Sequence, residues 1–311
     1  MRVVGPAEVE RSLDFPGLID ALRAVFATPA TVPRRSVHKL ANDDSPDAFA
    51  VLPSWNEEHI GLKAFTYLPG NPAQGRPVLH SQVLLFDRRT GEPRALVDGT
   101  SITCWRTAAI AALAADYLAR SDARRLLVCG TGNLAPYMVC AHASVRSYES
   151  IGVWGRDAAK AERAVAAVQA RSADLRCNVV RDLERAVRDA DVISCATGAR
   201  EPLIKGAWVR PGTHTDFFGN HERDARECDS ELVAAARVYV DSRANVLNEA
   251  GEILIPLAEG RIAQSHIVGE LADLCAGRVA GRRRDEDITL FKSVGTALAD
   301  LAAASLVLRR A

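Results

Sequence analysis

The chain has 311 residues, which is enough for two domains with separate hydrophobic cores. Its 39 Lys and Arg residues balance 39 Asp and Glu residues, so the composition provides no broad basic surface for nucleic acid. The longest apolar segments end well before the ~20 residues of a membrane-spanning helix, and the first residues lack the core of a signal peptide. We therefore expect a soluble, cytoplasmic protein that binds neither nucleic acid nor membrane.

The cysteines agree with that compartment. All seven are scattered, mostly in apolar runs, and no C-x-x-C spacing occurs. Such a pattern is typical of reduced, buried thiols and favours neither a disulfide framework nor a zinc cluster. We expect no bound metal.

Residues 1–120 are typical of an α+β domain. A strand candidate at 2–5 is followed by two short helices, at 6–13 and 16–27, whose apolar residues recur at helical spacing. Strand candidates then follow at 48–53, 59–66, 79–86 and 94–98, with a turn at 87–93, and predict a mostly antiparallel sheet. We expect Thr103 to cap an alanine-rich helix that runs to about Arg120.

Residues 121–293 are expected to form a dinucleotide-binding domain, because strands and helices alternate regularly from about residue 121 to about Asp241. The strand candidates are 126–130, 151–154, 178–180, 191–196, 214–218 and 238–241. This alternation predicts an α/β fold with a doubly wound parallel sheet of Rossmann type. The last helix, at 294–309, has a long apolar face. We expect it to complete the N-terminal domain, and packing on the nucleotide domain is the alternative.

A glycine turn lies at the centre of this pattern. The apolar run Leu126 to Cys129 ends in Gly130-Thr131-Gly132-Asn133-Leu134-Ala135, and a helical pattern follows. Free backbone N–H groups and the positive end of a helix dipole suit a diphosphate there, as in a dinucleotide-binding site. An ordinary strand-to-helix turn also fits the motif alone. The strand at 150–154 and the helix at 157–170 favour the dinucleotide interpretation.

The end of that next strand favours NADP over NAD. An acidic residue there would bind the ribose 2′-hydroxyl of NAD, whereas Arg156 after Gly155 offers a planar donor fork to a 2′-phosphate. Asp157 leaves NAD open, since it is either a ribose ligand or the N-cap of the helix. A solvated surface charge is the alternative for Arg156.

Three cations of the first domain stand where an apolar or small residue is expected. Arg35 lies in a loop, Lys63 lies inside a strand, and Arg106 lies in the first turn of the alanine-rich helix. A cation at a helix N-terminus opposes the dipole, so we expect an anion to compensate Arg106. Together the three suit an α-carboxylate, and Lys63 can also transfer a proton. A solvent-facing position in an alternating strand is the alternative for Lys63.

These motifs, in this order, resemble the ornithine cyclodeaminase and mu-crystallin family over nearly the whole chain. The matching segments are 61–65, 90–99, 102–109, the glycine turn, 190–197, 211–214 and 289–295. The resemblance implies a homodimer paired through its N-terminal domains and a site between the two domains. It implies that Arg35, Lys63 and Arg106 hold the substrate carboxylate. It also implies that Thr197 and Ser293 lie near the nicotinamide; alternatively, Thr197 caps a turn and Ser293 caps the last helix.

Within the resembled family the chemistry divides. Cyclodeaminases oxidise an amino acid with bound NAD, lose ammonia on ring closure and return the hydride, whereas reductases deliver hydride from NAD(P)H to a cyclic ketimine carboxylate or to a keto acid with an amine. This chain has Ala50 and His221 where the cyclodeaminases carry carboxylates, so ornithine is a poor fit. Asp216 is a candidate relocated carboxylate and His221 a candidate general acid, although structural or solvated roles fit both.

We therefore expect an NAD(P)-dependent oxidoreductase that acts on a small imino acid such as pyrroline-2-carboxylate. The alternative enzyme is ornithine cyclodeaminase, a lyase that converts ornithine to proline and ammonia with catalytic NAD. The resemblance to mu-crystallin implies a third class, a ligand-binding protein without catalysis, against which the intact Lys63 and Arg106 weigh.

Overall fold

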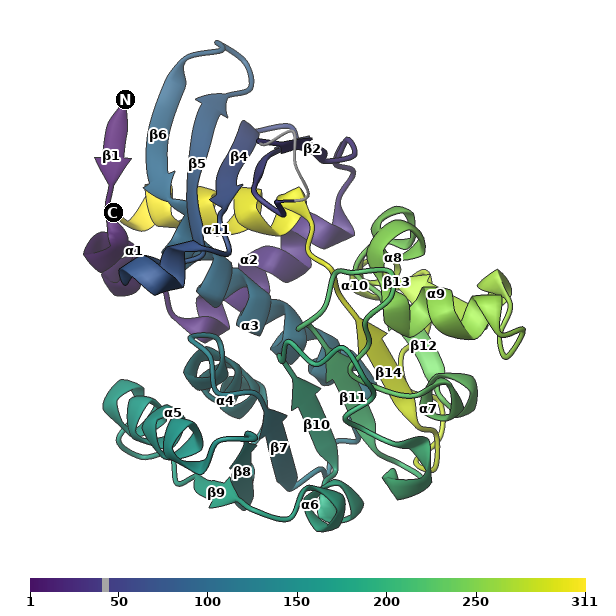
Figure 1. The fold of residues 1–311 in the computed structure, drawn as a ribbon. Coiled ribbons are helices and arrows are strands. Elements are labelled where there is room, and N and C mark those ends of the chain that lie inside the picture. The colour runs from purple at the N-terminus through teal and green to yellow at the C-terminus, as the bar shows by residue number, and fades with distance from the viewer. Residues whose placement is uncertain (41–44) are drawn as a thin grey trace. The chain divides into compact units, whose positions relative to one another are not determined.

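The computed structural model describes residues 1–40 and 45–311. These residues form two compact units, Met1–Arg106 with Thr296–Ala311 and Thr107–Gly295 (Figure 1). The C-terminal helix, α11 (Ala297–Arg310), thus belongs to the first unit by its contacts. The domain boundary that the sequence predicts near residue 120 separates the substrate-binding domain from the dinucleotide-binding domain. It is defined by function and not by contacts, and it stays a prediction.

The first unit is built on a six-stranded sheet in the order β1-β6-β5-β4-β3-β2. Its strands are β1 (Arg2–Val4), β2 (Ser36–Lys39), β3 (Ala48–Trp55), β4 (His59–Tyr67), β5 (Leu79–Asp87) and β6 (Pro93–Asp98). Only the β1–β6 pair is parallel, which confirms the mostly antiparallel sheet. Strand β2 is missing from the sequence prediction, because all four of its residues are exposed and it has no buried alternation.

Three helices of this unit are α1 (Pro6–Ser12), α2 (Phe15–Ala27) and α11. Helix α11 packs on α2 and on the inner face of β3, β4 and β5. Gly61 permits the close approach, because a Cβ atom there would lie 2.8 Å from Cδ1 of Leu301. The long apolar face of α11 is thereby buried, including Asp300, a carboxylate in its first turn.

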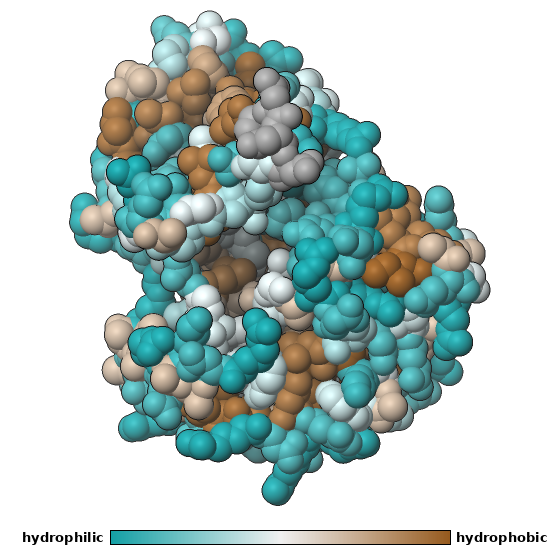
Figure 2. Space-filling view, in the orientation of Figure 1, coloured by the Kyte–Doolittle hydropathy of each residue, from teal (hydrophilic) through white to brown (hydrophobic). Residues whose placement is uncertain are grey.

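The outer face of the sheet is apolar as well. Val3, Leu96, Leu84, Leu62 and Pro53 are register partners in one row that crosses five strands. Val3 is 69% exposed, and the other four are partly exposed. Figure 2, in the orientation of Figure 1, shows hydrophobic residues gathered over β5 and β6. The surfaces of monomeric proteins usually expose apolar side chains singly, so a continuous row of five forms a larger apolar patch than is usual.

The alanine-rich helix begins earlier than the sequence predicts. Helix α3 (Gly99–Leu118) is capped by Asp98, whose Oδ1 accepts a hydrogen bond from Ser101 N at 2.8 Å. Thr103 lies inside the helix and donates to Gly99 O at 2.7 Å, so the prediction that Thr103 is the cap was wrong. Arg106 consequently lies in the second turn, and the argument from the helix dipole does not apply to it.

The second unit contains an eight-stranded sheet, entirely parallel, in the order β13-β12-β14-β11-β10-β7-β8-β9. Its strands are β7 (Arg125–Cys129), β8 (Ser150–Trp154), β9 (Asn178–Val180), β10 (Val192–Cys195), β11 (His214–Phe217), β12 (Arg237–Val240), β13 (Ile267–Glu270) and β14 (Thr289–Lys292). Its helices, besides part of α3, are α4 (Ala135–Val145), α5 (Ala158–Arg171), α6 (Leu183–Asp189), α7 (Ser230–Ala235), α8 (Arg243–Glu249), α9 (Gly251–Ala258) and α10 (Leu271–Cys275).

This order confirms the doubly wound, Rossmann-type sheet. Strand order reverses between β7 and β10, and this is the switch point at which such sheets bind ligands. Strands β13 and β14 are not among the predicted strands, which end at residue 241. Strand β14 enters the sheet between β11 and β12.

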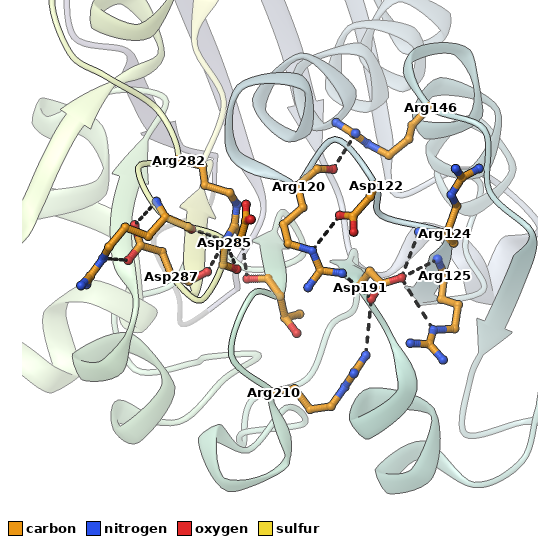
Figure 3. Close-up of polar contacts among 12 residues, drawn as sticks. Arg120, Asp122, Arg124, Arg125, Arg146, Asp191, Arg210, Arg282, Asp285 and Asp287 are labelled. Carbon is orange, nitrogen blue, oxygen red and sulfur yellow. Dashed lines mark hydrogen bonds and ion pairs between the residues drawn. The ribbon is translucent and has the colours of Figure 1, made fainter.

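Asp191, just before β10, connects several segments at the end of the sheet where β7 and β10 begin (Figure 3). Its Oδ2 accepts from the backbone N–H groups of Arg124 and Arg125 at 2.9 and 3.0 Å, and its Oδ1 accepts from Arg120 at 3.1 Å. Arg210 approaches Oδ1 at 3.4 Å. Burial alone would raise the pKa of Asp191, but these donors and charges outweigh it and hold the pKa below its ordinary value.

Replacing Asp191 by Asn is therefore expected to lower the free energy of unfolding by about 2 kcal/mol at pH 7, after allowance for solvent screening by the half-exposed arginines. A depressed carboxylate pKa stabilises the fold above pH ~4 and ceases to do so as pH falls through the folded-state pKa. Urea denaturation at pH 7 and pH 3.5 measures this, and the difference from wild type should shrink at the lower pH. Exposed Asp174→Asn is the control, and an equal effect of the two substitutions contradicts the expectation.

Candidate functional site

The glycine turn of the second unit has the geometry of a diphosphate cradle. Gly130 has φ of +130°, and a Cβ atom there would lie 2.5 Å from the carbonyl oxygen of Ala196. Only glycine therefore lets β7 turn this close to the end of β10. Helix α4 then begins at Ala135 after Leu134, while Gly132 and Asn133 are exposed at its N-terminus. This turn presents backbone N–H groups and the positive helix end to an anion.

A pocket of about 710 Å³ opens at this turn. It is lined by residues 130–132, 154–156 and 196–203, which follow the carboxyl ends of β7, β8 and β10. The pocket thus lies at the switch point of the sheet, where doubly wound folds bind dinucleotides. It contains five of the residues that the sequence predicts for the cofactor, namely Gly130, Thr131, Gly132, Arg156 and Thr197.

Two other predicted cofactor residues have different surroundings. Asp157 is the N-cap of α5, and its side chain accepts from Lys160 N at 3.1 Å, which confirms the capping alternative. Ser293 is buried at the end of β14 and donates to Asp241 at 2.7 Å. The last helix is capped by Thr296, so the idea that Ser293 caps it was wrong. A position of Ser293 near the nicotinamide stays a prediction.

Thr197 is held by hydrogen bonds to the buried carboxylate of Glu227. Both its backbone N–H, at 2.7 Å, and its hydroxyl, at 2.8 Å, donate to Oε1 of Glu227. The hydroxyl also accepts from Ala199 N at 3.2 Å, which confirms that Thr197 caps a turn. Thr197 therefore faces the pocket with its polar atoms already oriented.

The first unit contains a separate cluster of charges. Lys63, on the inner face of β4, donates to Asp300 Oδ1 at 2.9 Å and to Thr103 Oγ1 at 2.6 Å. Arg106 Nε donates to the same Asp300 oxygen at 3.2 Å. The side chains of Lys63 and Asp300 are 4% and 2% exposed, so the solvent-facing alternative for Lys63 was wrong. Asp300 is the anion that compensates Arg106.

Burial and neighbouring charges set the protonation of this cluster. Burial lowers the pKa of Lys63, Asp300 opposes the change, and the charges of Arg106 and Arg35 lower the pKa further. Burial alone would raise the pKa of Asp300, but the two cations outweigh it and the pKa is lowered. Lys63 and Arg106 carry two positive charges against the single negative charge of Asp300, so the cluster has an excess of positive charge.

Arg106 keeps donors available for a ligand. Only its Nε has a hydrogen-bond partner among residues 1–40 and 45–311, and its side chain is 11% exposed. The two terminal nitrogens form the fork that binds a carboxylate in bidentate fashion. Arg35, half-buried just before β2, lies close enough for its charge to act on Lys63. The structure thus brings Lys63 and Arg106 into direct contact with one carboxylate and places Arg35 within electrostatic range.

Asp216 lies in a buried polar network of the second unit. It accepts from Ser194 at 2.5 Å, and its other oxygen lies 3.4 Å from His142 Nε2 and 3.8 Å from His214 Nε2. All four residues are fully buried. Burial raises the pKa of Asp216 and lowers that of His214. Asp216 does not line the pocket at the glycine turn, and its catalytic role stays a prediction.

The two positions that depart from the cyclodeaminase pattern are also defined. Ala50 is fully buried on the inner face of β3, opposite Phe65 and packed with Leu52 and Ala297. His221 is exposed on the loop after β11, and its role as a general acid stays a prediction. The side chain at this position is thus an uncharged methyl group.

Sequence reasoning missed two buried carboxylates of these sites, Asp300 and Glu227. Asp300 carries a signal, because it is an acidic residue on the apolar face of the last helix. Glu227 carries none, since it lies in a polar loop between β11 and α7 without any periodic pattern. In the part of the chain that the structure describes, no three His, Cys, Asp or Glu side chains are grouped as metal ligands, and no helix has the length and apolarity to span a membrane.

The whole chain is similar to several known proteins. The chain is 48% identical over 313 residues to Δ1-pyrroline-2-carboxylate reductase of Colwellia psychrerythraea, covering 100% of this chain and 99% of that protein. The structure of Δ1-pyrroline-2-carboxylate reductase of Thermococcus litoralis in complex with NADH and L-proline matches with a TM-score of 0.94 and 34% identity over 100% of this chain and 97% of that one. An archaeal alanine dehydrogenase dimer with bound NAD matches with a TM-score of 0.92 and 27% identity, covering 100% and 95%.

The sequence profile of the ornithine cyclodeaminase/mu-crystallin family matches residues 3–311, almost the whole chain. The pocket at the glycine turn and the cluster of Lys63, Arg106 and Asp300 lie within that match. This chain belongs to the ornithine cyclodeaminase/mu-crystallin family.

Proposed function

We propose that this chain is a nicotinamide-dependent reductase of Δ1-pyrroline-2-carboxylate that produces proline. The observation that carries the proposal is the cluster of Lys63, Arg106 and Asp300, which combines an excess positive charge with a lysine of lowered pKa. A small cyclic imino acid requires these two properties, a cation for its carboxylate and a proton donor for its nitrogen. The relatives named above provide the substrate and the cofactor class.

Each side chain of the cluster has a defined task. The terminal nitrogens of Arg106 bind the substrate carboxylate, and Arg35 adds a second positive charge. Lys63 donates a proton to the ring nitrogen, and Thr103 and Asp300 hold its Nζ in place. The reduced nicotinamide, when bound, supplies a hydride to the imine carbon. One hydride and one proton would convert the C=N bond into the CH–NH of proline.

The pocket at the glycine turn binds the cofactor. Gly130 and the N-terminus of α4 would hold the diphosphate, and Thr197, which lines the same pocket, would lie near the nicotinamide. We propose NADPH as the preferred cofactor, because Asp157 is engaged as a helix cap while Arg156 is exposed in the pocket lining. We therefore propose that the guanidinium group of Arg156 donates hydrogen bonds to the 2′-phosphate of NADPH.

Replacing Arg156 by Ala is expected to lower kcat/KM for NADPH by about 10- to 100-fold, the effect of losing a charged hydrogen bond to phosphate. For NADH, which lacks the 2′-phosphate, kcat/KM should change by less than about twofold. Steady-state kinetics with both cofactors measure the ratio. Arg163→Ala, at an exposed position of α5, is the control. Equal losses for the two cofactors would remove Arg156 from this role.

Ornithine cyclodeaminase is the alternative activity within the family. The buried methyl group of Ala50 provides no counter-charge for the second amino group of ornithine, which disfavours it. The decisive assay compares two reactions of the purified protein. The proposal expects stoichiometric oxidation of NADPH with Δ1-pyrroline-2-carboxylate. Release of ammonia and proline from ornithine, without net change of cofactor, would support the lyase instead.

We also propose a cytoplasmic homodimer that pairs through the outer face of the six-stranded sheet. The row of Val3, Leu96, Leu84, Leu62 and Pro53 is an apolar surface that the same row of a second copy could cover in a twofold interface. A related archaeal protein is a dimer, and burial of this row would remove apolar surface from water. Light scattering after size exclusion should give the mass of two chains for the wild type and of one chain for Leu84→Glu.

A further inference from the structure

A cluster of three charged side chains, fully buried, lies beneath the loops of the second unit. Lys292, at the end of β14, forms an ion pair with Glu252 of α9 at 2.8 Å and donates to Asn220 O at 2.8 Å. Glu252 accepts from the backbone N–H of Glu227 at 3.0 Å. The side chains of Lys292, Glu252 and Glu227 are all 0% exposed. Burying a charge costs desolvation free energy, so a cluster of this kind is expected to hold a particular arrangement of the backbone in place.

Glu227 joins two loops that follow neighbouring strands. Its Oε1 accepts from the backbone N–H and the hydroxyl of Thr197, after β10, and its Oε2 accepts from Gly219 N at 2.7 Å, after β11. The two loops approach so closely that a Cβ atom at Gly219 would lie 2.0 Å from Thr197 O. Lys292 fixes the same loop one residue further on, at Asn220. The cluster thus fixes the backbone at one end of the pocket.

Thr197 is the residue of this arrangement that lines the pocket. Its hydroxyl donates its single proton to Glu227 and accepts from Ala199 N, which leaves one lone pair for the pocket that Thr197 lines. With Glu227 ionised, Thr197 can only accept from a ligand. This suits the amide N–H of a nicotinamide carboxamide.

We propose that Glu227 is a positioning residue of the cofactor site, which fixes the Thr197 hydroxyl as an acceptor for the nicotinamide carboxamide and thereby couples cofactor affinity to its own ionisation. This inference rests on the proposed function only in that the pocket binds a nicotinamide dinucleotide. It requires nothing of the imino acid substrate.

The charges around Glu227 explain why its ionisation varies near neutrality. Burial raises its pKa to about 7, with Lys292 lowering and Glu252 raising it, and the backbone N–H donors lowering it. The thiols of Cys195 in β10 and of adjacent Cys228 are also close enough to interact electrostatically with Glu227, and burial raises the pKa of both so that they stay neutral. The carboxylates of Glu227 and Glu252 therefore have one ammonium group, that of Lys292, as their common counter-charge. At low pH a proton on Glu227 makes the net charge of the three side chains zero.

Protonation of Glu227 changes what Thr197 offers. A neutral carboxyl group has one proton to donate, so it can no longer accept all three hydrogen bonds that Thr197 and Gly219 donate. A proton on Oε1 reverses the bond to the Thr197 hydroxyl, which then lacks its fixed direction. Cofactor affinity should therefore fall as pH falls through about 7.

The test is the Kd of NADH between pH 5.5 and 8.5, measured by nicotinamide fluorescence without substrate. NADH is chosen because it lacks the 2′-phosphate, a monoester whose second pKa of about 6 would add its own pH dependence. The wild type should bind about tenfold more tightly at pH 8.5 than at pH 5.5. Glu227→Gln should bind about tenfold more weakly than wild type at pH 8.5 and show no inflection near pH 7.

Two further variants complete the test. Glu231→Gln, exposed on α7, should keep the wild-type profile. Thr197→Val retains Glu227 and should lose most of the pH dependence, which keeps the test valid if Glu227→Gln does not fold. Absence of NADH binding by the wild type would overturn the proposed cofactor site itself. Tight binding by both Glu227→Gln and Thr197→Val, or a wild-type inflection that both retain, would overturn the inference alone.

Discussion

Replacing Lys63 by Met is expected to lower kcat for pyrroline-2-carboxylate reduction by about 10³-fold, in the range that loss of a general acid causes. Methionine is close to lysine in length and apolar, so it fills the buried position on β4 without placing a new charge there. Asp300 keeps Arg106 as its partner, and the cofactor pocket of the second unit is untouched. Stopped-flow single-turnover kinetics, with NADPH binding checked by fluorescence, separate chemistry from binding.

The pH dependence of the wild-type enzyme provides an independent check of the same residue. Burial lowers the pKa of Lys63 below its ordinary value of about 10.4, and only the protonated form can donate. The rate should therefore fall as pH rises through a pKa below that value, and Lys63→Met should lack this limb. Lys39→Met, on exposed β2 of the same unit, is the control. A Lys63→Met enzyme within about tenfold of wild type would remove Lys63 from proton transfer.

Replacing Asp300 by Asn is expected to cost about 3–5 kcal/mol of unfolding free energy, because it leaves Lys63 and Arg106 without their buried counter-charge. Asparagine has the same shape, so the loss reports on charge and not on packing. Denaturant unfolding at pH 7 measures it, with exposed Asp20→Asn on α2 as the control, for which we expect a change within about 0.5 kcal/mol.

The same variant makes a kinetic prediction. The charge of Asp300 raises the pKa of Lys63, so its removal lowers that pKa further. The alkaline limb of the pH–rate profile should consequently move to lower pH. An unchanged stability together with an unchanged limb would show that Asp300 does not act on Lys63.

The second unit could be predicted from the sequence with few errors, for physical reasons that are visible at β7 and β10. Both strands are short. Apart from the exposed Arg125 at the start of β7, all their residues are apolar or small, and their alternation with helices leaves few topologies. Strand β14 was missed because its pattern is mixed and Lys292 stands at its end. Its lysine is buried with two partners, the carboxylate of Glu252 and the carbonyl oxygen of Asn220, and these lie 40 and 72 residues away in the chain.

In the candidate sites, too, the sequence did not predict partners that lie far away in the chain. The sequence predicted Lys63 and Arg106 as unusual cations, since each interrupts an apolar or small-residue pattern. Their common partner Asp300 lies at the far end of the chain, and only the packing of α11 on β4 brings it within 2.9 Å of Lys63. The start of α3 was misplaced because Asp98 and Thr103 are both good capping residues, and the local pattern does not choose between them.

The central claim is that this chain reduces the C=N bond of a cyclic imino acid with hydride from a nicotinamide. Its most direct test is the incubation of Δ1-pyrroline-2-carboxylate with NADPH that carries deuterium at C4 on the transferred face, followed by mass spectrometry of the product. We expect proline with one deuterium at C2, in an amount equal to the NADP formed. Proline without deuterium at C2, or no proline under conditions in which NADPH is bound, would contradict the account.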